Sequence, residues 1–192
     1  MGITAWPFPK SSAPDLLMNS IRVTSILVAL LATFPALAHT GVGSSASFFG
    51  GLAHPLTGAD HLMAMVAVGL WARLLGQRAL ALLPISFLVA MLAGALAAMT
   101  RLALPMVEAG ILMSIPVLWA AIAFRVKPPM VIAAALCAVF AFAHGFAHGA
   151  ELTEGASPTL YSVGFLSATC VLIFSGARIA RWVLARTEAA KH

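Results

Sequence analysis

The chain has 192 residues, of which 61% are hydrophobic and 9% are charged, and its mean hydropathy is +1.00. A soluble domain typically carries about 25% charged residues, so this composition excludes a soluble globular protein and predicts one compact, all-α membrane bundle. The net charge of +5 comes from cations that fall singly between apolar runs and at the C-terminus, which indicates membrane topology rather than a nucleic-acid partner.

Residues 1–38 are predicted to be an N-terminal extension that ends in a cleavable signal peptide. From Met18 a short polar region is followed by an apolar run and by Ala36-Leu37-Ala38, an Ala-x-Ala cleavage pattern. We therefore expect the true start at Met18 and a mature chain of residues 39–192, a transmembrane bundle with a basic cytoplasmic tail. The alternative is an uncleaved first helix, although an apolar run of about a dozen residues is short for crossing a bilayer.

The mature chain is predicted to contain about five transmembrane helices. The first covers residues 48–71 and contains Pro55 and Gly58, which predict a break or kink in the HPLTG motif. Four cleaner spans follow, and each has the length that a membrane-crossing helix needs. They are residues 79–100, 103–124, 128–148 and 157–177. Cys137 lies in one of these apolar runs and is expected to be a core residue rather than part of a disulfide.

The charges in the connections between these spans predict an orientation. The first and third connections and the C-terminal tail are basic, whereas the second contains Arg101 alone and the fourth contains Glu151 and Glu154. Because cytoplasmic loops are enriched in Lys and Arg, these charges predict the orientation of a multi-pass membrane protein. Its mature N-terminus is expected outside and its C-terminus in the cytoplasm.

The first span carries an unusual polar motif, which runs from His54 through Asp60 to His61. Asp60 is the only formally charged residue between residues 24 and 71, and an ionisable residue inside a membrane span is a functional-site hypothesis. On a straight helix His54 and His61 would be about 10 Å apart along the axis, too far to share one ion. Either the break folds them together, or each pairs with another span. Asp60 is expected to orient a ligating histidine through its second ring nitrogen.

A second polar motif lies at the outer end of the fourth span. Spacings of four and three residues place His144, His148 and Glu151 on one helix face. Imidazoles and a carboxylate without a thiolate form a donor set that suits nickel, cobalt or zinc. Two further residues are candidates. Glu108 is expected to act as a counter-ion, to line a cation path, or to extend to the outer interface, and His39 would gain a free amine on cleavage.

Three segments of the chain together resemble the HupE/UreJ family of nickel permeases. They are the run from His54 to Trp71, Val107-Glu108-Ala-Gly110, and His144-Gly-x-Ala-His148-Gly-x-Glu151. The resemblance covers nearly all of the mature chain and implies uptake of nickel, with cobalt as a second substrate, for enzymes such as hydrogenase or urease. It also implies which residues handle the metal: His54, Asp60, His61, His144, His148 and Glu151.

Other functions remain open at this point. The chain could instead be an accessory protein that hands nickel to hydrogenase or urease maturation, an intramembrane metalloenzyme, or a membrane haem protein with histidine axial ligands. No enzyme is expected, because the chain has no His-Glu-x-x-His motif. The expected partners are the metal ion, the lipid bilayer and further copies of the chain in a homo-oligomer.

Overall fold

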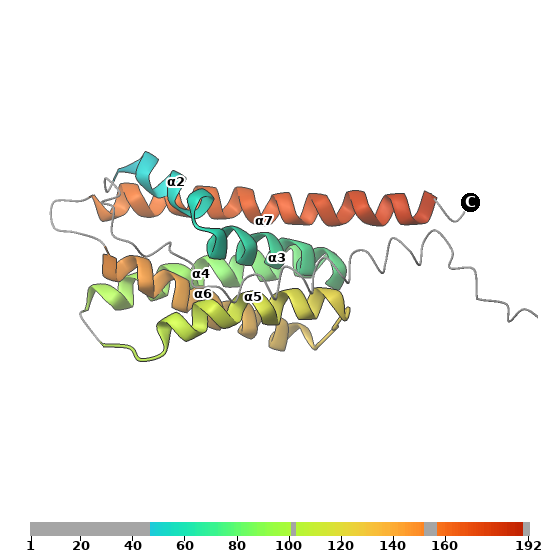
Figure 1. The fold of residues 1–192 in the computed structure, drawn as a ribbon, viewed down its shortest axis with the longest axis horizontal. Coiled ribbons are helices and arrows are strands. Elements are labelled where there is room, and N and C mark those ends of the chain that lie inside the picture. Colours follow the sequence, from blue (N-terminus) through green and yellow to red (C-terminus); the bar gives the residue numbers. More distant parts are fainter. Residues whose placement is uncertain (1–46, 101–102, 152–156, 190–192) are drawn as a thin grey trace, which may run out of the picture.

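The computed structural model describes residues 47–100, 103–151 and 157–189, and this part of the chain is all-helical (Figure 1). Its helices are, in order, α2 (Phe48–Thr57), α3 (Ala59–Leu75), α4 (Ala79–Met99), α5 (Val107–Ala123), α6 (Met130–Glu151) and α7 (Pro158–Ala189). The predicted all-helical membrane bundle is therefore confirmed. The predicted signal peptide and His39 lie outside the described residues.

Among the described residues, three helices are long and apolar enough to cross a membrane, namely α4, α6 and α7. The pair α2 and α3 passes the same test as one span that is bent by 82°. Helix α5 is also apolar but has 17 residues, so it rises about 25 Å and is shorter than the predicted span. It begins late because Pro105 disfavours a helical residue before it and Met106 has a positive φ of 68°.

The predicted break in the first span lies at Gly58. Pro55 remains inside α2, whereas the backbone leaves the helical region at Gly58, where φ is −87° and ψ is 115°. The Gly58 N–H still donates to the carbonyl of His54 at 3.2 Å, and the Gly58 carbonyl accepts from the Leu62 N–H at 3.0 Å. The two helices are therefore joined by a single non-helical residue, so Asp60 falls in the first turn of α3.

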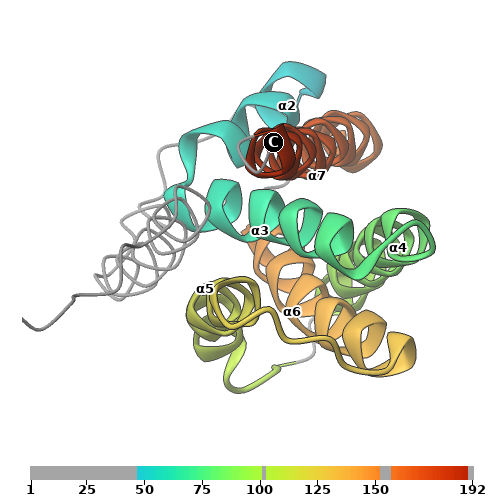
Figure 2. The same cartoon turned by 90° about the vertical axis from the view of Figure 1, so that its right-hand side faces the viewer.

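Helix α3 lies between α7 on one side and α4, α5 and α6 on the other, while α2 packs along α7 (Figure 2). Glycines bring the helix backbones into contact at the crossings. A Cβ atom at Gly69 of α3 would lie 1.8 Å from the carbonyl oxygen of Ile173, and one at Gly145 of α6 would lie 1.9 Å from that of Met91. No larger side chain fits at either position, which is how membrane helices gain contact without a hydrophobic driving force.

The distribution of side chains is that of a protein surrounded by lipid. Large apolar side chains such as Val131, Phe49 and Phe174 are exposed on the outside of the bundle. Several polar side chains are buried inside the bundle. The buried polar residues are Asp60, His61, Ser114, His144, His148 and Thr169. Cys137 is buried in the core with a free thiol, which confirms its prediction as a core residue.

Candidate metal site

Four histidines from three helices gather in the interior of the bundle. Their ring centroids are 4.5 Å apart for His54 and His148, 4.4 Å for His61 and His148, and 4.8 Å for His61 and His144. The break at Gly58 also brings His54 within 5.7 Å of His61. The break therefore brings the two rings of the first motif near each other, and α6 places His144 and His148 beside them.

Asp60 fixes the orientation of His61. Its Oδ1 atom accepts hydrogen bonds from the His61 backbone N–H at 2.9 Å and from the ring Nδ1 at 2.8 Å, and both side chains are buried. Because the carboxylate accepts the Nδ1 proton, the lone pair of the neutral ring lies on Nε2. That atom meets Nε2 of His148 directly. A carboxylate that orients an imidazole in this way is the usual support of a metal-binding histidine.

Ser114 of α5 orients His144 in a similar manner. The Ser114 hydroxyl donates to the carbonyl of Ile111 at 2.6 Å and lies 3.1 Å from Nε2 of His144. Since the hydroxyl has one proton, which the carbonyl takes, Ser114 accepts from the Nε2–H group of His144. The lone pair of His144 then lies on Nδ1. Ser114 was not predicted from the sequence, although a hydroxyl within the apolar run of residues 111–118 was a usable signal.

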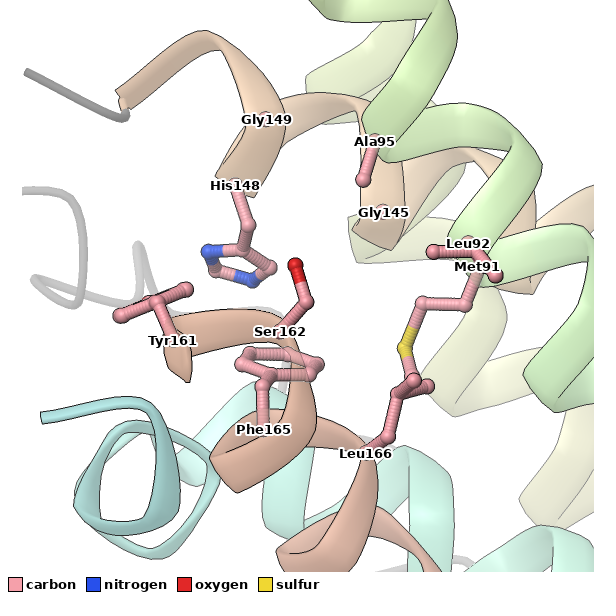
Figure 3. Close-up of a pocket in the computed structure, with 10 residues that line it drawn as sticks. All are labelled: Met91, Leu92, Ala95, Gly145, His148, Gly149, Tyr161, Ser162, Phe165 and Leu166. Atoms are coloured by element: carbon pink, nitrogen blue, oxygen red, sulfur yellow. The ribbon is translucent and has the colours of Figure 1, made fainter. Parts of the chain in front are cut away.

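Helix α7 covers the cluster with aromatic rings. The Phe165 ring lies 4.8 Å from His148 and 5.9 Å from His54, and Tyr161 lies 6.2 Å from His54. Beside His148 lies a cavity of about 30 Å³ between α4, α6 and α7, which is large enough for a water molecule, and Figure 3 shows the side chains that line it. Neither aromatic residue was predicted from the sequence to lie at the site, although Tyr161 is the single tyrosine of the chain.

The histidines meet in pairs rather than around one point. Within residues 47–100, 103–151 and 157–189, no three His, Cys, Asp or Glu side chains are arranged to hold one ion together. The four histidines differ in exposure. His54 is half-buried, whereas His148, His61 and His144 are 4%, 0% and 0% exposed. The cluster is therefore a row of neighbouring imidazoles that leads from the edge of the bundle into its interior.

Of the remaining predicted site residues, the structure describes the side chain of Glu108 alone. Glu151 is the last residue of α6, and its side chain is outside the described part of the structure. Glu108 is exposed in the first turn of α5 and lines a separate cavity of about 420 Å³ between α5 and α6. None of the four clustered histidines lines that cavity.

A model of the HupE / UreJ protein family matches residues 27–192. The chain is also similar to Protein HupE of Rhizobium leguminosarum bv. viciae, with 40% identity over 164 residues, which is 85% of each chain. No solved structure matches it.

Proposed function

Because this chain belongs to the HupE / UreJ family and is a multi-pass membrane protein, we propose that it is a nickel permease of the bacterial inner membrane. Cobalt is the second candidate substrate. The observation that carries this proposal is the row of four imidazoles inside an apolar bundle. Ionisable side chains are expensive inside a membrane and mark ion pathways when they occur there.

The ion is proposed to pass from one imidazole to the next. His54 is half-buried and receives the ion, His148 and His61 bind it next, and His144 lies deepest. The ring centroids of successive members are less than 5 Å apart, at 4.5, 4.4 and 4.8 Å. An ion can therefore be shared between neighbours without crossing an apolar gap. Pairwise contacts suit transport, because conduction needs several sites that bind weakly enough to release the ion.

The donor types favour nickel or cobalt over harder cations. Imidazole nitrogen is a good ligand for nickel, whereas magnesium and calcium prefer sites made of oxygen atoms. The buried carboxylate of Asp60 supplies negative charge beside His61. We further propose that Glu151 and His39 add donors at the outer mouth and that Glu108 attracts cations at the same side of the membrane.

The orientation of the protein is proposed from its cations. Arg73 at the end of α3, and Arg125 and Lys127 between α5 and α6, line one cavity. In Figure 1 that end of the bundle also contains the C-terminal end of α7, whereas α2 lies at the other end. Positive residues favour the cytoplasmic side. The histidine cluster is thus proposed to face the outside, with residues 1–38 removed as a signal peptide.

Metal accumulation in cells tests the proposal. Cells that lack their own nickel uptake systems are expected to accumulate labelled nickel when they express this chain. Unlabelled cobalt is expected to compete for uptake, whereas magnesium is expected to have no effect, because the site offers imidazole donors. Accumulation no higher than in cells with an empty vector would contradict a permease function, provided that the protein is found in the membrane fraction.

A further inference from the structure

A second polar site lies at the end of the bundle away from the histidines. It is a cavity of about 160 Å³ between the end of α3, the α5–α6 connection and α7. His61 and Arg73 are separated by 12 residues of α3, which is about 18 Å along the helix axis. The lining residues are Arg73, Leu74, Arg125, Val126, Lys127 and Leu184. Three of these lining residues are cations and none is acidic.

Arg73 has a buried donor that lacks an acceptor. Its Nε atom is shielded from solvent and has no hydrogen-bond partner among the described residues. Buried polar groups are nearly always hydrogen-bonded, and the donor fork of a guanidinium matches the oxygens of a phosphate. Arg73 also lines the cavity, so its guanidinium group can offer donors to an anion bound there.

Arg125 occupies a backbone position that usually belongs to glycine. Its φ is 51°, and the hydrogen bonds from Arg125 N to Ile122 O at 3.1 Å and from Val126 N to Ala121 O at 2.9 Å form a Schellman motif at the end of α5. Glycine would adopt this left-handed conformation at lower cost. The turn does not require an arginine at this position, but Arg125 adds a third cation to the lining of the cavity.

The α5–α6 connection is also held firmly against α3. The indole N–H of Trp71 donates to the carbonyl of Val126 at 3.0 Å, and Trp71 is fully buried. The cations of the connection and the cation of α3 are thus kept together although the sequence separates them by about 50 residues. The cavity is consequently a defined site rather than a chance approach of two surface loops.

We propose that this cavity binds the phosphate group of an anionic ligand. Arg73, Arg125 and Lys127 would contact the phosphate oxygens, since Arg and Lys are the usual partners of phosphate in proteins. Leu74, Val126 and Leu184 supply apolar walls, which suit the remainder of a phospholipid. Basic pockets between membrane helices are typical binding sites for lipid headgroups. The same phosphate chemistry also admits inorganic phosphate, and the experiment below separates the two sources.

Native mass spectrometry of the purified full-length chain tests this site. The protein is mixed with cardiolipin, phosphatidylglycerol or phosphatidylcholine, or with millimolar inorganic phosphate. We expect retention of the anionic lipids over phosphatidylcholine, and a loss of about five-fold in Arg73→Gln and in Arg125→Gly. Arg125→Gly is informative because glycine suits the turn, so this variant is expected to fold as well as the wild type. Arg181→Gln removes an exposed cation of α7 outside the cavity and is expected to retain lipid normally.

These outcomes distinguish binding at a specific site from a general attraction of anions to positive charge. Displacement of the lipid by inorganic phosphate supports a site for the free ion, and retention of the lipid supports a headgroup site. Both results support phosphate binding. The proposal is overturned if neither anionic lipid nor phosphate binds, or if anionic lipid and phosphatidylcholine are retained equally. It is also overturned if Arg181→Gln loses as much lipid as Arg73→Gln and Arg125→Gly.

Discussion

His54 and His61 belong to one motif of eight residues, yet they lie in different surroundings on the two sides of Gly58. His61 is completely buried, and Asp60 fixes its ring through Nδ1. His54 is half-buried and is contacted by the rings of Phe165 and Tyr161. The two imidazoles of one motif therefore differ in exposure, although their ring centroids lie 5.7 Å apart.

This difference indicates a division of roles along the row of histidines. A ring that is fixed by a carboxylate presents its lone pair in one direction, which favours selective binding. A half-buried ring can receive an ion that still retains part of its water. We therefore expect changes on the α3 side of the break to remove transport, and changes on the α2 side to weaken mainly the capture of the ion.

The largest effect is expected for His61→Ala, which removes the ring that contacts both His148 and His144. The initial rate of nickel uptake is expected to fall by more than about 100-fold. Loss of a residue that only hydrogen-bonds a metal-binding histidine already lowers affinity or activity by about 10–100-fold. The matched control is Thr57→Ala. Thr57 is exposed and bonds the carbonyl of His54 in its own helix. If His61→Ala takes up nickel as fast as a fully active Thr57→Ala control, His61 does not lie on the ion path.

Asp60→Asn tests the orienting carboxylate alone. The variant keeps the size of the side chain but loses its negative charge, so the Nδ1 proton of His61 is no longer fixed by a carboxylate. Nickel affinity and uptake are expected to fall by about 10–100-fold. Isothermal titration of the purified protein with nickel measures the first effect, and uptake at equal expression measures the second. Wild-type affinity in this variant would show that Asp60 has only a structural role.

His54→Gln tests the α2 side of the break. The substitution keeps a polar side chain at the edge of the bundle but replaces the imidazole. The KM for nickel uptake is expected to rise about ten-fold with little change in maximal rate, because loss of binding that is equal in the ground state and the transition state raises KM alone. Uptake rates over a range of nickel concentrations measure both constants. A fall in maximal rate equal to that of His61→Ala would show that the two histidines have the same role.

The smallest effect is expected for Gly58→Ala, at the break itself. A Cβ atom at this position would lie 3.0 Å from Oδ1 of Asp60 and 3.0 Å from Nδ1 of His61, so the pair must shift by a few tenths of an ångström. Uptake is expected to fall about five-fold, since a tight contact of this kind costs on the order of 1 kcal/mol. Thr57→Ala, one residue earlier, again serves as the control. A loss as large as in Asp60→Asn would mean that the break tolerates no side chain.

Much of this arrangement could be predicted from local features of the sequence. Apolar runs of helical length predicted the bundle, Pro55 and Gly58 predicted the broken span, and the spacing of His144 and His148 placed both rings on one helix face. These are local properties, because each depends on neighbouring residues alone. The predictions about nickel and about the orientation in the membrane stay predictions.

The contacts between helices could not be predicted in the same way. Helical periodicity shows which residues share a face, but it does not show which faces meet. The meeting of α3 with α7 depends on the fit of Gly69 against the backbone at Ile173, more than 100 residues later in the chain. For the same reason Ser114 and Phe165 were missed, since each reaches the histidines only through such packing.

The ion is proposed to cross the membrane through the histidine row, and nickel flux into liposomes tests this proposal most directly. The purified protein is placed in liposomes that contain a nickel-sensitive dye, next to liposomes with His61→Ala and with Thr57→Ala. We predict nickel entry for the wild type and Thr57→Ala, and none above empty liposomes for His61→Ala. Nickel that binds the wild-type protein but never reaches the dye would contradict the account and indicate an accessory protein that hands nickel on.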